Sequence, residues 1–132
     1  MKRAYLAVIG LLAVFALVLG CAKGYESEKT VDGLKVRLSV DRYPLVKSDN
    51  TLQVKVVDAA GAPMTNAKIK VRYFMPPMPG MAPMDFEAEA MLKGGVYVIT
   101  ANIPMEGGWK VEVTVVRPGK ASATAAFNLD AR

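Results

Sequence analysis

The sequence predicts an all-β fold, and three observations lead to this expectation. After Gly33, apolar and polar residues alternate with a period of two, as in strands with one buried and one wet face. Turn-forming residues such as glycine and proline separate the alternating runs at short intervals. No stretch of this region is long enough and amphipathic enough for a helix. The pattern predicts an antiparallel, immunoglobulin-like β-sandwich of about seven strands, with a small barrel as the alternative.

The first three runs alternate aliphatic or aromatic residues with charged or polar ones. Their inward residues are Leu34, Val36, Leu38 and Val40, then Leu52, Val54 and Val56, then Ile69, Val71, Tyr73 and Met75. Branched and aromatic side chains favour strands. The segments Ser48-Asp49-Asn50 and Ala60-Gly61-Ala62-Pro63 are expected as turns between the runs. We therefore expect strands over residues 34–40, 52–56 and 68–75.

Four further runs continue the alternation. In residues 86–92, the expected inward residues are Phe86, Ala88, Ala90 and Leu92, and the outward ones are Glu87, Glu89 and Met91. The outward glutamates would face a basic stripe on the preceding strand, formed by Lys68, Lys70 and Arg72. Gly94-Gly95 then suits a tight hairpin turn with positive φ. The last strands are expected over residues 96–103, 109–115 and 121–129, with Trp109, Phe127 and Leu129 as their large core candidates.

The N-terminus has the layout of a bacterial lipoprotein signal. Two basic residues precede an apolar run over residues 4–19, which is shorter than the ~20 residues of a spanning helix. The run ends in Val18-Leu19-Gly20-Cys21, which resembles a lipobox, the motif in which the cysteine receives lipid. We expect residues 1–20 to be a cleaved signal helix, with an uncleaved anchor as the alternative. Lipid on Cys21 and a polar tether over residues 21–32 would hold a domain over residues 33–132 at a membrane.

Composition excludes many kinds of active site. The chain has no histidine and one cysteine, which rules out imidazole catalysis, intrachain disulfides and cysteine-cage zinc sites. Removal of Lys2 and Arg3 leaves 15 basic residues against 12 acidic ones, a net charge of +3. This charge is too small and too scattered to indicate nucleic-acid binding. We expect a protein that is not an enzyme.

Residues 75–84, Met-Pro-Pro-Met-Pro-Gly-Met-Ala-Pro-Met, carry four methionines at a constant spacing of three. The prolines favour polyproline II, which has three residues per turn and would align Met75, Met78, Met81 and Met84 along one edge. Gly80 would let the chain fold back. Thioether sulfur is a soft ligand that suits Cu(I) or Ag(I), so these four are candidate metal ligands. Met105 is a possible extra thioether.

Two other interpretations of this segment stay open. Met75 continues the inward set of its strand and suits the core, because methionine is an adaptable core residue. The segment as a whole could be a stiff loop or an apolar strip that docks a partner protein.

These motifs resemble the YtkA-like domain family, which is related to FixH proteins. The resemblance covers residues 33–129 and is most specific in the Met-Pro loop and in the stretch containing Gly95, Tyr97, Met105, Gly107 and Trp109. It implies an extracytoplasmic immunoglobulin-like module associated with copper handling, heavy-metal efflux or assembly of haem–copper oxidases, without an enzymatic activity. Related loops often contain a histidine, whereas Ala82 and Pro83 stand there in this chain, so any copper would be held by thioethers alone.

The expected function is therefore that of a lipid-anchored extracytoplasmic binding module. It would bind Cu(I) or Ag(I) reversibly for delivery to an oxidase or an efflux partner. The alternative is a metal-free module that docks a membrane complex. If the source has two membranes, the module would lie at the outer membrane or on the periplasmic face of a membrane.

Overall fold

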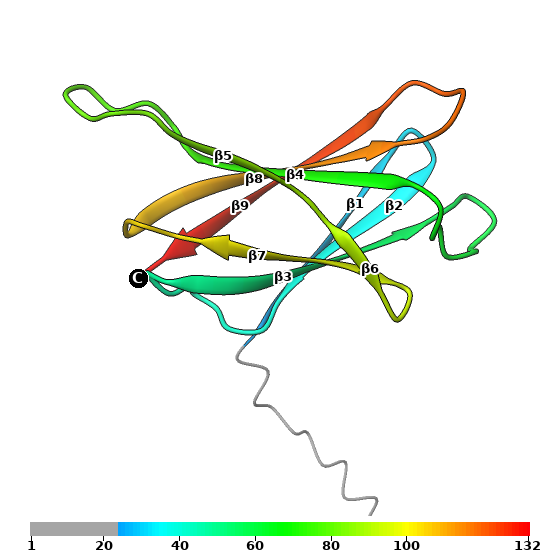
Figure 1. Cartoon of the computed structure of the whole chain (residues 1–132), viewed down its shortest axis with the longest axis horizontal. Helices are drawn as coiled ribbons and strands as arrows, with labels where there is room; N and C mark the ends of the chain where they lie inside the picture. Colours follow the sequence, from blue (N-terminus) through cyan, green and yellow to red (C-terminus); the bar gives the residue numbers. More distant parts are fainter. Residues whose placement is uncertain (1–23) are drawn as a thin grey trace, which may run out of the picture.

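The computed structural model describes residues 24–132, which form two antiparallel sheets packed face to face (Figure 1). The five-stranded sheet has the order β1-β2-β3-β7-β6, and the four-stranded sheet has the order β5-β4-β8-β9. The strands are β1 (Tyr25–Val31), β2 (Leu34–Val40), β3 (Asp49–Val57), β4 (Lys68–Met75), β5 (Met84–Glu89), β6 (Met91–Lys93), β7 (Val96–Asn102), β8 (Gly107–Val116) and β9 (Ala123–Ala131). The expected all-β sandwich is confirmed. The expected signal helix and Cys21 lie outside the described residues.

The alternating residues build the core as expected. Along β2, β3, β4 and β8 every second side chain is buried between the sheets, because successive side chains of a strand point to opposite faces. Trp109, Phe127 and Leu129 are all about 1% exposed. The Gly94-Gly95 turn joins β6 to β7 with positive φ at both glycines. Within residues 24–132 there is no helix that could span a membrane.

The expected tether is wrong over residues 25–31, which form the edge strand β1. β1 pairs with the whole of β2, from Tyr25 opposite Val40 to Val31 opposite Leu34. Its turn, Asp32-Gly33, has positive φ at both residues, a geometry for which Asp-Gly is one of the preferred sequences. This dipeptide was the available sequence signal. The strand lacks an apolar period because its inward face is only partly buried: Tyr25 and Val31 pack against the core, but the polar Ser27 and Lys29 stand between them.

Residues 86–92 do not form one strand. The chain passes from the four-stranded sheet to the five-stranded sheet at Ala90, whose backbone N–H donates to the carbonyl of Ile69 (2.8 Å). β5 and β6 therefore belong to different sheets, and two residues expected in the core, Phe86 and Leu92, are 39% and 46% exposed. A change of sheet does not interrupt a period-two pattern, so the alternation could not reveal it.

The connection between β2 and β3 is organised by Asn50, the one buried polar residue of the described chain. Its side-chain oxygen accepts a bond from the Val46 N–H (2.9 Å), and its amide donates to the carbonyls of Val46 (2.8 Å) and Ser48 (2.9 Å). The expected Ser48-Asp49-Asn50 turn is thus partly wrong, because Asp49 and Asn50 already belong to β3. Buried polar groups need such partners, and here the amide replaces backbone pairing.

Candidate functional site

The Met-Pro segment is the loop of the β4–β5 hairpin, and it projects beyond the sheets (Figure 1). Met75 ends β4 and lies opposite Met84, the first residue of β5. At the tip, the Met81 N–H donates to the Met78 carbonyl (3.2 Å), which closes a β-turn with Pro79 and Gly80 at its centre. Gly80 has a φ of 80°, so proline and glycine occupy the positions that a type II turn favours. The loop is therefore a folded hairpin and not the single polyproline II edge expected from the prolines.

This fold arranges the four methionines as two pairs. Residues opposite each other in an antiparallel pair have Cβ atoms about 4.5–5.5 Å apart, which applies to Met75 and Met84. The ends of a β-turn have Cα atoms within about 7 Å, which applies to Met78 and Met81. All four border one cavity of about 10 Å³, together with Pro76, Pro77, Ala82 and Pro83. A cavity of this size holds about one water-sized particle.

The two pairs differ in exposure. Met75 is 8% exposed and Met84 is half-buried, whereas Met78 and Met81 are 43% and 39% exposed. Solvent therefore reaches the tip of the loop, while its base belongs to the sandwich.

Met75 belongs to the core and to the cavity at once. A Cβ on Gly107 would lie 3.1 Å from its terminal methyl carbon, and Gly107 has a φ of 131° that other residues rarely adopt. The start of β8 thus leaves room for Met75. In the sequence, Gly107 stands out only as part of the stretch that resembles the YtkA-like family, since nothing local shows that a methionine packs on it.

Met105 lies beside the core, and its carbonyl accepts the indole N–H of Trp109 (3.0 Å). The residue is half-buried and packs against the core cluster. It is not among the residues that border the loop cavity. The structure thus brings together Met75, Met78, Met81 and Met84 and leaves Met105 outside the set.

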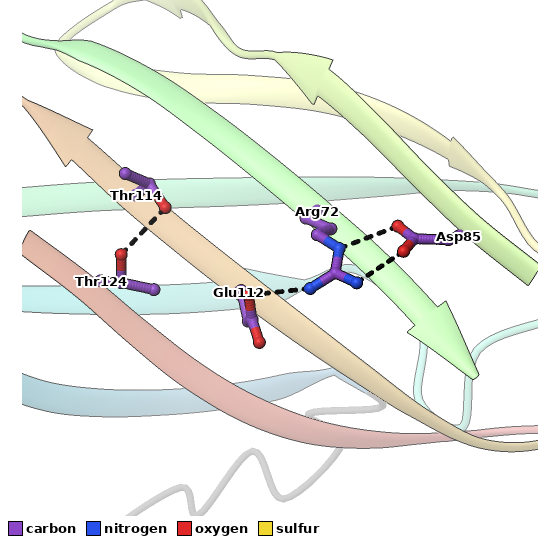
Figure 2. A network of polar contacts seen from close by, with 5 residues as sticks. All are labelled: Arg72, Asp85, Glu112, Thr114 and Thr124. Carbon is purple, nitrogen blue, oxygen red and sulfur yellow. Dashed lines mark hydrogen bonds and ion pairs between the residues drawn. The ribbon is translucent and has the colours of Figure 1, made fainter. Parts of the chain in front are cut away.

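The outer face of the four-stranded sheet carries a network of paired charges. Arg72 donates from Nε and Nη2 to the two carboxylate oxygens of Asp85 (2.8 and 2.5 Å) and from Nη1 to Glu112 (3.4 Å), as Figure 2 shows. The register places Arg72 opposite Glu87 and Lys70 opposite Glu89, as the sequence predicted. Lys68 also pairs with Glu89 (3.6 Å). No group of three or more carboxylate or cysteine side chains within residues 24–132 could hold a metal ion.

The Arg72 hydrogen bonds hold the pKa of Asp85 below its usual value of 3.8, with the positive charge of Arg72 adding to the effect. The stability that this carboxylate contributes is therefore present above pH 3.8 and is lost as the pH falls through the lower, folded-state pKa. Arg72→Met should raise the pKa of Asp85 toward 3.8 in an NMR titration of its carboxyl carbon. Arg72→Lys should raise it only partway, because lysine keeps the charge without the paired donors. An unchanged pKa in Arg72→Met would contradict this assignment.

The sequence model of the YtkA-like family matches residues 28–114. The chain belongs to the YtkA-like family. The match begins inside β1 and runs through the Met-Pro loop into β8, so it contains the hairpin and all four loop methionines. No curated protein matches the chain.

Among solved structures, the chain is similar to FetP of uropathogenic E. coli strain F11, a protein crystallised as isolated after recombinant expression in the periplasm. The two chains are 13% identical, with a TM-score of 0.55 over 82% of this chain and 95% of FetP. At this level of identity the likeness shows a shared fold.

Proposed function

We propose that this YtkA-like chain is an extracytoplasmic binding module that holds Cu(I) reversibly through the thioethers of Met75, Met78, Met81 and Met84. The observation that carries the proposal is the folding of the loop, which places all four residues around one cavity the size of a single small particle. Thioether sulfur is neutral and soft, so it prefers Cu(I) or Ag(I) to hard cations. Membership in the YtkA-like family and the likeness to a protein expressed in the periplasm fit an extracytoplasmic location.

The exposure of the loop supports exchange of the metal and not its storage. Met78 and Met81 lie at the solvent-exposed tip, where an acceptor could replace them as ligands one at a time. The chain has no histidine to strengthen the site or to favour Cu(II). Lipid on Cys21 would keep the module at a membrane, where an oxidase or an efflux system could receive the ion. Because binding and releasing one Cu(I) involves no chemical conversion of a substrate, we expect no enzymatic activity.

A Cu(I) competition titration on the soluble chain from residue 22 tests the proposal. The parent should bind one Cu(I) with micromolar affinity or better, and a variant with all four loop methionines changed to leucine should bind none. Leucine keeps the bulk of methionine and removes the sulfur, so the fold should survive. Met91→Leu is the matched control, because this methionine is exposed on β6 and outside the loop.

Two results would count against the metal site. If neither the parent nor the four-leucine variant binds Cu(I) while both stay folded, the loop is a docking element or a stiff connection. If the four-leucine variant binds as well as the parent, the ion sits elsewhere.

A further inference from the structure

The free edge of β5 has features of a docking site that the proposed metal chemistry does not use. β5 is the outermost strand of the four-stranded sheet, and within residues 24–132 it pairs only with β4. An open edge presents unpaired backbone groups to which another strand can add. On the inner face of this edge, Phe86 is 39% exposed although it stacks on Tyr73 (5.3 Å between ring centroids) and lies 6.3 Å from Trp109. A large ring is thus held in place by the core and left half uncovered.

The outer faces of β4 and β5 carry rows of opposite charge. The β4 row is basic, with Lys68, Lys70 and Arg72. The β5 row is acidic, with Asp85, Glu87 and Glu89, and all three carboxylates are exposed. Arg72 and Lys68 pair with Asp85 and Glu89, but Glu87 has no ion pair within residues 24–132. Because opposite charges on neighbouring strands are favourable, a strand added beyond β5 would need a basic row.

A second copy of this chain does not supply such a strand. Two β5 strands side by side would bring their acidic rows together, which is unfavourable. The other edge strands of a second copy do not supply a basic row either. The outer faces of β1 and β9 carry no basic residue, and β6 has three residues with one lysine. Charge therefore acts against self-association through this edge and leaves it open to a different protein.

We propose that the free edge of β5 receives an extended segment of a partner protein in which basic residues alternate with apolar ones. Backbone hydrogen bonds to residues 84–89 would supply the pairing, as in other cases of strand addition. The basic side chains would lie beside Asp85, Glu87 and Glu89, and the apolar ones would cover Phe86 and Ala88. The proposal is independent of the metal, since none of its contacts involves a thioether of the loop tip.

A short synthetic peptide in which lysine alternates with valine tests the proposal, with NMR of the metal-free chain as the readout. When the peptide binds, the changes in the chain's amide chemical shifts and the gain in its protection from hydrogen exchange should concentrate on residues 84–89. A peptide with glutamate in place of lysine should bind at least about fivefold more weakly at low salt. Glu87→Lys should lower the affinity for the lysine peptide by about fivefold and raise the affinity for the glutamate peptide. This variant should fold, because the Glu87 carboxylate is exposed and unpaired within the described chain.

Glu26→Lys is the control on β1, the edge strand of the other sheet, where the same change also removes an ion pair with Arg37 (3.3 Å). It should leave the affinity of the lysine peptide unchanged. The proposal is overturned by equal affinity for both peptides, by an unchanged affinity in Glu87→Lys, or by perturbations centred on β1, β6 or β9. It is also overturned if the lysine peptide produces no shifts at millimolar concentration.

Discussion

Trp109→Ala should lower the free energy of unfolding by about 3–5 kcal/mol, the usual cost of removing a large buried aromatic side chain. Trp109 is 1% exposed and lies 6.4 Å from Tyr73 and 6.3 Å from Phe86, between ring centroids. Alanine would leave a cavity at the centre of this cluster. It would also leave the Met105 carbonyl without the indole N–H that it accepts at 3.0 Å. Urea unfolding followed by circular dichroism measures the loss.

Trp109→Phe is the matched control for the hydrogen bond. It keeps most of the aromatic bulk and removes the donor, so the loss of stability should be smaller, about 1–2 kcal/mol. A loss below about 1 kcal/mol in Trp109→Ala would show that Trp109 is not the anchor of this core.

Gly80→Val should lower the Cu(I) affinity of the loop by about tenfold, if the proposed function is correct. Gly80 adopts a φ of 80° in the turn that joins Met78 to Met81. A β-branched residue at this φ costs about 1–3 kcal/mol, and each 1.4 kcal/mol is a factor of ten in affinity. The turn would open, and the two exposed thioethers would no longer be held together. A Cu(I) competition titration against the parent chain measures the change.

Gly80→Asn separates backbone conformation from the size of the side chain. Asparagine tolerates positive φ far better than valine, so this variant should keep most of the affinity. Both variants should keep the fold of the sandwich, because no atom of residues 24–132 lies within 4 Å of a Cβ placed on Gly80, but Gly80→Val should lose up to about 1–3 kcal/mol of stability to the strained φ. Equal affinity in Gly80→Val and the parent would mean that the turn does not organise the metal ligands.

Short-range signals predicted most of the sandwich. The inward residues from Leu34 to Met75 and the core positions of Trp109, Phe127 and Leu129 follow from alternation alone, because each strand buries one face. The Gly94-Gly95 hairpin follows from the φ values that glycine permits. Family membership was likewise carried by local motifs.

The mistaken strand assignments have a common cause. β1 is an edge strand that is held in place by its pairing with β2. Its mostly polar residues therefore show no alternation of apolar and polar positions from which a strand could be predicted. At Ala90 the chain leaves the sheet of β5 and enters the sheet of β6. A period of two continues unchanged across this point, so it does not show which sheet a residue belongs to.

The sequence was sufficient to identify the methionines as the chemically distinctive residues of this chain, because soft neutral sulfur at a regular spacing is a property of residue types. Their arrangement in space depends on long-range pairing. The β4–β5 register sets Met75 opposite Met84, and Gly107 of β8 makes room for Met75 from more than thirty residues away. The uncovered ring of Phe86 likewise results from the place of β5 at the edge of its sheet. Such contacts join residues far apart in the chain, and neither periodicity nor spacing records them.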